Sequence, residues 1–259
     1  MTAPDLDGYA RYAICCAPRR TTPLGAMGAA WLGHDIESGA EATPAAPSDL
    51  AKQRAALVRG PRRTGIAALL KPPFELTGGL GGDALDMATA ALARGRPQAV
   101  GPGLVCKAEA EGVALRPGGA APEIAALAEA CVTQLDMLRA PLDAQALAAA
   151  RRAGLDMTEE ANLRNWGHPE VLARFRFGFR LTGPLPRREA AATARSLGAH
   201  FAPILGDAFA IDEIALCGDP GEGAPLRLLR RYPLGAAYAR FRAGLGGAGG
   251  PDTLWRTTP

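Results

Sequence analysis

Two stretches of the chain follow the same order of elements, and this recurrence restricts the possible folds more than any other feature. Residues 62–76 and 175–185 each read as a strand that runs through a leucine into a proline stop, and aligning them sets Leu70 on Leu181. A helix and then two strands follow each stretch. The chain is therefore predicted to be an α+β protein built on a duplicated unit, with helices over 78–95 and 187–200 and strand pairs over 99–109 with 112–117 and 209–218 with 225–234.

The segments around the repeat complete the predicted domain. A first strand is expected over residues 11–18, and the strongest helical pattern, residues 122–139, has a stripe for packing on the outer side of a sheet: Ile124, Leu127, Cys131 and Leu135. Residues 143–165 are also predicted to be helical. We expect one bilobal domain over residues 1–235, with its halves meeting near 120–165, and a glycine-rich, flexible tail over 236–259.

Composition excludes some classes of protein and is neutral about others. The chain has 259 residues, 48% of them hydrophobic and 21% charged, which is ordinary for a globular protein with a sizeable core. Its 29 basic residues include only three lysines, Lys52, Lys71 and Lys107, alongside abundant Ala, Gly and Pro. Since this bias is compositional and the net charge is only +3, nucleic acid is not an expected partner.

Cysteine and histidine spacing gives no metal-site pattern. The five cysteines form no C-x-x-C pair and the three histidines lie far apart, so we expect neither a metal nor a cofactor. The apolar runs are too short to cross a bilayer, and an odd cysteine count without a signal peptide is typical of a reducing compartment. A cytoplasmic protein with no membrane partner is therefore expected.

The segment "FRFGFRLTGPL" has two different faces if it is a strand. Phe175, Phe177 and Phe179 alternate with Arg176, Gly178 and Arg180. The aromatic face is predicted to be core. A glycine between two arginines weakens a strand and often marks a place where a ligand or backbone approaches closely.

Several segments in a fixed order resemble one family over nearly the whole chain up to Leu234. They include "RYAICCAP", "PRRTGIAALLKPPFEL", "WGHPEVLARFRFGFRLTGPL" and "APLRLLRRYPL". The chain resembles the two-histidine phosphoesterase superfamily, in particular its phosphonate-metabolism branch. The resemblance implies two pseudo-symmetric α+β lobes whose antiparallel sheets, with helices outside, face each other across a central cleft.

The residues that this superfamily uses for catalysis are replaced here. Each lobe is expected to carry a His-x-Thr motif, in which the histidines exchange protons and the threonines hold phosphate oxygens. Ala67 and Leu69 stand at the first motif, and Gly178 and Arg180 at the second. None of these side chains can replace a catalytic histidine, which contributes roughly 10²–10⁴-fold. The resemblance therefore implies no catalytic residue and a non-hydrolytic relative, with the space vacated at Gly178 open to a ligand oxygen.

Four basic residues could give the vacated cleft a new use. Arg63, Lys71, Arg176 and Arg180 are expected on the strand faces that line it, and guanidinium groups suit phosphate oxygens. We therefore predict binding of a phosphorylated small molecule, of ribose or nucleotide type. The plainer alternative is that Arg180 pairs with an acidic residue and fills the site.

Two other functions remain open from the sequence. His168, in "WGHPE", could act as a relocated base in a cyclic phosphodiesterase, and an RNA-binding module is a third possibility. The glycine-rich "GGLGGD", residues 78–83, lacks the Lys-Ser/Thr of a phosphate-binding loop and is read as a connection.

Overall fold

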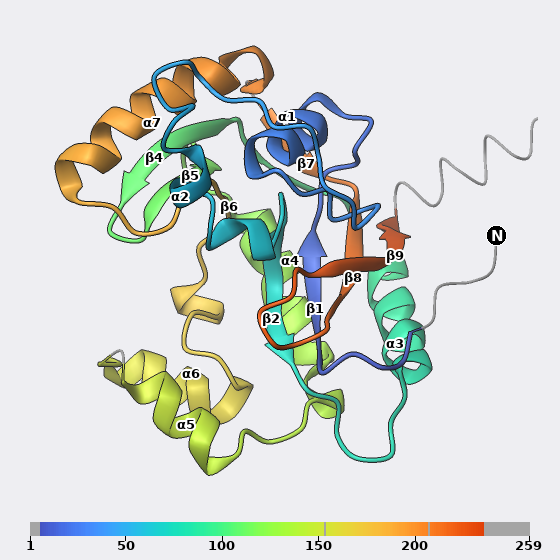
Figure 1. Cartoon of the computed structure of the whole chain (residues 1–259). Helices are drawn as coiled ribbons and strands as arrows, with labels where there is room; N and C mark the ends of the chain where they lie inside the picture. Colours follow the sequence, from blue (N-terminus) through green and yellow to red (C-terminus); the bar gives the residue numbers. More distant parts are fainter. Residues whose placement is uncertain (1–5, 153, 207, 236–259) are drawn as a thin grey trace, which may run out of the picture.

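Antiparallel sheets and seven α-helices make up the part of the chain that the structure describes, residues 6–152, 154–206 and 208–235 of a computed structural model (Figure 1). The α+β class predicted from the sequence is confirmed. The largest sheet has the strand order β2-β1-β8-β9, formed by β2 (Ala68–Phe74), β1 (Arg11–Cys16), β8 (Glu213–Asp219) and β9 (Arg227–Pro233).

Two smaller sheets complete the framework. The first has the order β4-β5-β6, with β4 (Leu104–Glu109), β5 (Gly112–Pro117) and β6 (Phe179–Arg180). The second pairs β3 (Ala99–Pro102) with β7 (Ala208–Ile211). Strands β2 and β6 are both edge strands, each in its own sheet, so neither is hydrogen-bonded to the other.

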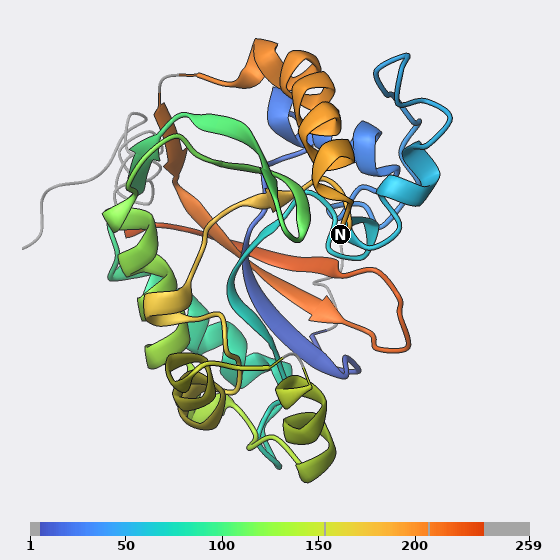
Figure 2. The same ribbon diagram turned by 90° about the vertical axis from the view of Figure 1, so that its left-hand side faces the viewer.

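The order of elements repeats along the chain. Strand β2 is followed by α3 (Gly82–Arg94) and strands β3, β4 and β5, and strand β6 is followed by α7 (Arg187–Phe201) and strands β7, β8 and β9. Each helix packs on the other unit's hairpin: α3 contacts β8 and β9, whereas α7 contacts β4 and β5 (Figures 1 and 2). The two units are thus interlocked, and their first strands lie at the edges of two different sheets.

The two faces of the four-stranded sheet carry side chains of different size. Large side chains such as Ile14, Leu70 and Leu216 belong to the main core, where α4 (Pro122–Gln134) also packs, and Ile124, Leu127 and Cys131 of that helix are buried as predicted. The opposite face is lined by small residues: Ala13, Cys15, Ala67, Ala215 and Cys217. Ile36 and Leu226 belong to the same buried cluster, and Ala67 and Leu69 at its border line a cavity.

The remaining helices connect and cap this framework. Helix α1 (Pro23–Leu32) begins at Thr22, whose hydroxyl accepts the Gly25 N–H, and ends at Gly33 in the left-handed conformation. A short helix α2 (Arg54–Leu57) follows it. Helices α5 (Ala144–Arg151) and α6 (Met157–Trp166) pack together away from α7 (Figure 2), and α6 begins with a capping box between Asp156 and Glu159.

Both strands of the predicted repeat are shorter in the structure than the sequence pattern predicts. Residues 61–63 form a 3-10 helix, so the strand expected over 62–76 begins only at Ala68. The strand expected over 175–185 is reduced to Phe179–Arg180 because it follows a 3-10 helix at 172–174 and has a partner on one side only. The predicted tail, residues 236–259, lies outside the described residues.

None of the helices among the described residues combines the length and the apolar character that crossing a bilayer requires.

Candidate functional site

A cavity of about 290 Å³ brings together all four positions at which the resemblance predicts lost motif residues, Ala67, Leu69, Gly178 and Arg180. Its charged lining consists of Arg116, Arg174, Arg176, Arg180, Glu111 and Glu170, and His168 also lines it. We call it the arginine cavity. Strand β2 and the residue before it supply the apolar wall, and the segment ending in β6 supplies the basic wall.

Helix α1 holds both walls in place. Gly28 has no side chain, which lets Ile66, directly before Ala67, pack against the helix backbone. On the other side the indole N–H of Trp31 donates to the carbonyl of Leu181, directly after Arg180, at 2.8 Å. A buried aromatic residue therefore fixes the end of the basic wall relative to the apolar one.

The alternation predicted for residues 175–180 is present although most of it is not regular strand. Phe177 and Phe179 are buried and their rings pack edge to face, while Arg176 and Arg180 are exposed and Gly178 is half-buried. The aromatic residues anchor the segment in the core. The arginines consequently lie on the cavity side.

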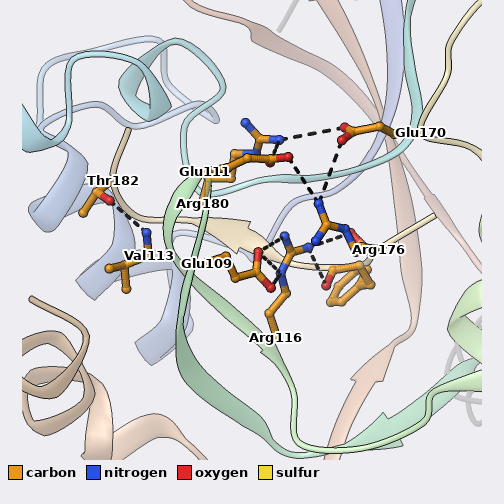
Figure 3. Close-up of polar contacts among 9 residues, drawn as sticks. Glu109, Glu111, Val113, Arg116, Glu170, Arg176, Arg180 and Thr182 are labelled. Carbon is orange, nitrogen blue, oxygen red and sulfur yellow. Dashed lines mark hydrogen bonds and ion pairs between the residues drawn. The ribbon is translucent and has the colours of Figure 1, made fainter. Parts of the chain in front are cut away.

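Two carboxylates lie beside Arg176 and Arg180 in the cavity (Figure 3). Glu111, in the turn between β4 and β5, accepts from Arg176 at 3.2 Å and from Arg180 at 2.5 Å. Glu170 lies 3.9 Å from both guanidinium groups. Arg180 is thus paired, as the plainer alternative expects, and yet the cavity beside it is not filled.

Arg116 occupies the space vacated at Gly178, which corrects the expectation of room for a ligand oxygen. A Cβ at position 178 would lie 2.6 Å from Arg116 Cδ and 2.7 Å from the Leu115 carbonyl oxygen. The Arg116 guanidinium makes a bidentate pair with Glu109, and its Nη1 donates to the carbonyls of Arg176 and Phe177 at 2.7 and 3.1 Å. A histidine and Arg116 cannot both occupy this place.

His168 lies on the cavity but is held as a neutral ring. Its Nδ1 accepts the N–H of Glu170 at 3.1 Å, so the proton of the neutral ring is on Nε2. Burial, assisted by the positive charge of Arg180, lowers the pKa of His168 to about 4. At neutral pH the ring can donate a hydrogen bond from Nε2, but it is not poised to accept a proton there.

Lys71 does not share the cavity with Arg176 and Arg180, contrary to the prediction from strand alternation. Cys15 pairs with Leu69 but Ile14 pairs with Lys71, so β2 has one extra residue at this point. This bulge places Lys71 on the Ile14 side of the sheet, where its Nζ donates to the Val132 carbonyl at 3.1 Å. The Lys71 side chain is only 2% exposed.

Arg63 is also separate from the arginine cavity. It lies in the 3-10 helix before β2 and lines another cavity of about 200 Å³, together with Arg11 and Asp219. The two cavities have Thr64 and Leu69 in common. Of the four predicted ligand-binding residues, only Arg176 and Arg180 line the same cavity.

The glycine-rich segment 78–83 leads into helix α3 and holds its N-terminus by a side chain. The backbone N–H of Gly82 donates to Asp7 at 2.8 Å. One of the N-terminal donors that could face a phosphate in a phosphate-binding loop is therefore already paired with a carboxylate.

Sequence reasoning missed the residues that come from other segments. The sequence does carry a signal for Arg116: it is an arginine inside an apolar strand, "GVALRP", where burying an unpaired charge would be costly. Glu111 and Glu170 lie in a turn and a loop, and nothing in their local sequence indicates that they converge on Arg180.

These observations define the class: an α+β protein in which the first strands of two repeated units border one cavity with arginine and glutamate side chains. Residues 69–227 match the family described as "Protein of unknown function (DUF1045)", and the chain belongs to that family.

Two curated relatives are similar over most of the chain. A "Ribose 1,5-bisphosphate phosphokinase PhnN" of Janthinobacterium sp. (strain Marseille) is 31% identical over 240 residues, which cover 88% of this chain and 51% of the relative. The protein of the same name from Laribacter hongkongensis (strain HLHK9) is 33% identical over 225 residues, or 85% of this chain and 51% of the relative. The chain thus spans about half the length of the curated relatives that it matches.

Proposed function

We propose that this chain is a non-hydrolytic relative of the two-histidine phosphoesterases that binds a phosphorylated small molecule of ribose type in the arginine cavity, in the service of phosphonate metabolism. A single observation carries this function: the four positions of the motifs expected from the resemblance line one cavity, and four arginines also line it. In this proposal the cavity corresponds to the phosphoesterase cleft, without a histidine at Ala67 or Gly178.

The exposed arginines of the lining are the groups that could hold an anion. Four guanidinium groups and two carboxylates line the cavity. Arg116 and Arg174 are neutralised from outside the lining by Glu109 and Asp156, so the site has no net charge and an anion would depend on Arg176 and Arg180. Arg176 and Arg180 are each 54% exposed and share Glu111, so an incoming phosphate can take over hydrogen bonds that this carboxylate now accepts.

The names of the relatives support a ribose phosphate as the ligand class. Both are named as kinases of a ribose bisphosphate, and both are about twice as long as the matched stretch. This chain has no Lys-Ser/Thr phosphate-binding loop in its glycine-rich segment, so the kinase activity of the relatives is assigned to the half that this chain does not span. The matched half would then hold the substrate or product of that same chemistry.

Calorimetric titration tests the proposed function with three ligands: inorganic phosphate, ribose 5-phosphate and ribose 1,5-bisphosphate. Arg180→Ala should weaken binding roughly 10- to 100-fold, or about 1.4–2.8 kcal/mol, because it removes a charged donor. Arg195→Ala is the matched control, since Arg195 is exposed on α7 outside this cavity. No binding at millimolar ligand, or equal binding by Arg180→Ala, would refute the proposed anion site.

The position of His168 favours a second candidate, a cyclic phosphodiesterase acting through relocated residues. His168 lines the cavity beside Glu170, and its Nε2–H could donate to a leaving oxygen. Turnover of 2′,3′-cyclic nucleotides that is abolished by His168→Ala would establish this enzyme and overturn the non-hydrolytic function. If none of these cyclic nucleotides is turned over, ligand binding without hydrolysis remains the proposed function.

A further inference from the structure

A second, smaller cavity adjoins the arginine cavity and is lined in part by Lys71. Its volume is about 130 Å³, and Pro72 and His168 line both cavities. Phe74, Trp166 and Val171 provide apolar parts of the lining. We call it the lysine cavity. Ligand pockets usually measure about 300–1,000 Å³, so this one suits only a small molecule.

The residue at its base is a lysine in a chain that otherwise uses arginine. Only three of the 29 basic residues are lysines, and Lys71 is the buried one. Arginine keeps its proton in proteins, whereas a buried lysine can lose it and become a nucleophile. The choice of residue therefore matters chemically at this position.

The Lys71 amine makes one hydrogen bond of ordinary length and one longer contact with a carboxylate. Nζ is 3.1 Å from the Val132 carbonyl, near the end of α4, and 3.5 Å from Asp136 Oδ1. It also lies 4.8 Å from the centre of the Phe74 ring. Asp136 is held more closely by Arg139, at 2.8 Å. The ammonium thus lacks a short ion pair, which favours loss of its proton.

Burial lowers the pKa of Lys71 to about 8, and Asp136 opposes this shift. Arg139 pushes the pKa in the same direction as burial, and Cys131 on α4 pushes it back. The other charged or titratable groups around the cavity are Arg11, Glu75, Asp143 and His168. About a tenth of the amine is therefore unprotonated at pH 7, and about a quarter at pH 7.5.

We propose that Lys71 binds a small aldehyde or ketone covalently as an iminium in the lysine cavity. The amine nitrogen attacks the carbonyl carbon, and the carbonyl oxygen leaves as water after the carbinolamine forms. Counted from the ammonium and the carbonyl compound, the products are one iminium and one water, so charge and atoms balance. No oxidant or reductant takes part.

The charges around Lys71 fit an iminium better than other amine products. The iminium keeps one positive charge facing Asp136, whereas an amide or a carbamate would leave that carboxylate beside a neutral or negative group. The Phe74 ring favours a cation in the same way. This site does not rest on the function proposed for the arginine cavity.

Reductive trapping tests the site on the full chain. Glycolaldehyde and cyanoborohydride at pH 7.5 convert an iminium into a stable secondary amine, which peptide mapping locates. Lys52 and Lys107 are exposed internal references, and the α-amino group, whose ordinary pKa is about 8, controls for proton loss alone. Labelling of Lys71 should exceed that of Lys52 and Lys107 at least tenfold and should saturate with glycolaldehyde concentration, while the α-amino group responds linearly.

The variants separate a binding site from a structural lysine. Lys71→Arg keeps a cation near Val132 and should abolish only the saturable label, with its fold checked by circular dichroism. Arg180→Ala should leave the label unchanged, so failure of the arginine cavity and failure of this site are distinguishable. A linear response at Lys71, or labelling below that of the α-amino group, would overturn the proposal and leave Lys71 as a cap for the end of α4.

Discussion

Strands β2 and β6 begin the two repeated units and border the same cavity, but their charged side chains are placed differently. On the β2 side, Ala67 and Leu69 continue the small-residue core, and the cation Lys71 is turned to the far face by a bulge. On the β6 side, Arg176 and Arg180 remain half exposed at the cavity. Both are edge strands, but β2 has seven residues and its core face is covered by α4, whereas β6 has only two residues.

Under the proposed function, one wall of a former catalytic cleft has become core and the other has become a charged surface. A buried strand accepts small apolar residues at low cost, because they continue existing packing. An edge segment with solvent beside it accepts arginines, because their charge stays hydrated and paired. Arg116 combines both features, because it is a buried charged side chain that holds the segment before β6 through the carbonyls of Arg176 and Phe177.

The largest effect is expected from removing Arg116. Arg116→Met leaves Glu109 and the carbonyls of Arg176 and Phe177 without their donor, and breaking a buried pair in this way costs about 3–5 kcal/mol. The Arg116 side chain is 11% exposed, so the lower end of that range is expected. Urea unfolding measures the loss. Arg176→Met, at an exposed pair, should cost no more than about 1 kcal/mol, and equal losses would contradict the comparison.

A second effect concerns the buried cation of β2. The pKa of Lys71 falls from 10.5 to about 8 on folding, so the unfolded chain binds more protons between these pH values and Lys71 makes stability rise with pH there. The slope is at most about 1.4 kcal/mol per pH unit, a total on the order of 3 kcal/mol. Because burial also raises the pKa of Cys16 and Cys131, which acts in the opposite direction, the readout is the difference between wild type and Lys71→Met.

Urea midpoints at pH 7.5, 8.5 and 9.5 check this prediction. The stability of wild type relative to Lys71→Met should increase across the series. A difference that is constant with pH would mean that Lys71 is not desolvated on folding, and the contrast with the exposed arginines of β6 would fail.

A third effect tests the close approach at Gly178. Gly178→Ala places a methyl group 2.7 Å from the Leu115 carbonyl oxygen and against Arg116, which should cost about 1–3 kcal/mol of unfolding free energy. Gly183→Ala is the matched control, because a Cβ there meets no atom within 4 Å. If both variants unfold at the same urea concentration, Arg116 does not fill the vacated space. For the same reason a histidine at position 178 requires that Arg116 first be removed.

The sequence predicted what depends on local pattern. The α+β class, the buried stripe of α4 and the alternation of Phe177 and Phe179 with Arg176 and Arg180 all follow from periodicity, and the structure has them. The predicted position of Lys71 was wrong because alternation assumes regular strand pairing. A bulge depends on the pairing with the partner strand, which the local sequence does not show. Arg116 and Glu111 reach the site from another sheet, so no local pattern could place them beside Gly178 and Arg180.

The smallest effect concerns the carboxylate that now holds the basic wall. Glu111→Gln removes the negative charge shared by Arg176 and Arg180 but keeps an oxygen that can accept one hydrogen bond. If a phosphate competes with Glu111 for these guanidinium groups, its affinity should rise about 3- to 10-fold, or about 0.7–1.4 kcal/mol. The gain stays small because Glu170 remains 3.9 Å from both arginines. Calorimetry with ribose 5-phosphate measures it, and Glu160→Gln, which affects only the exposed pairs with Arg151 and Arg164, should leave the affinity unchanged. Unchanged or weaker binding by Glu111→Gln would show that the carboxylate positions the arginines instead of competing for them, and the β6 wall would then be a closed ion-pair network like that of Arg116.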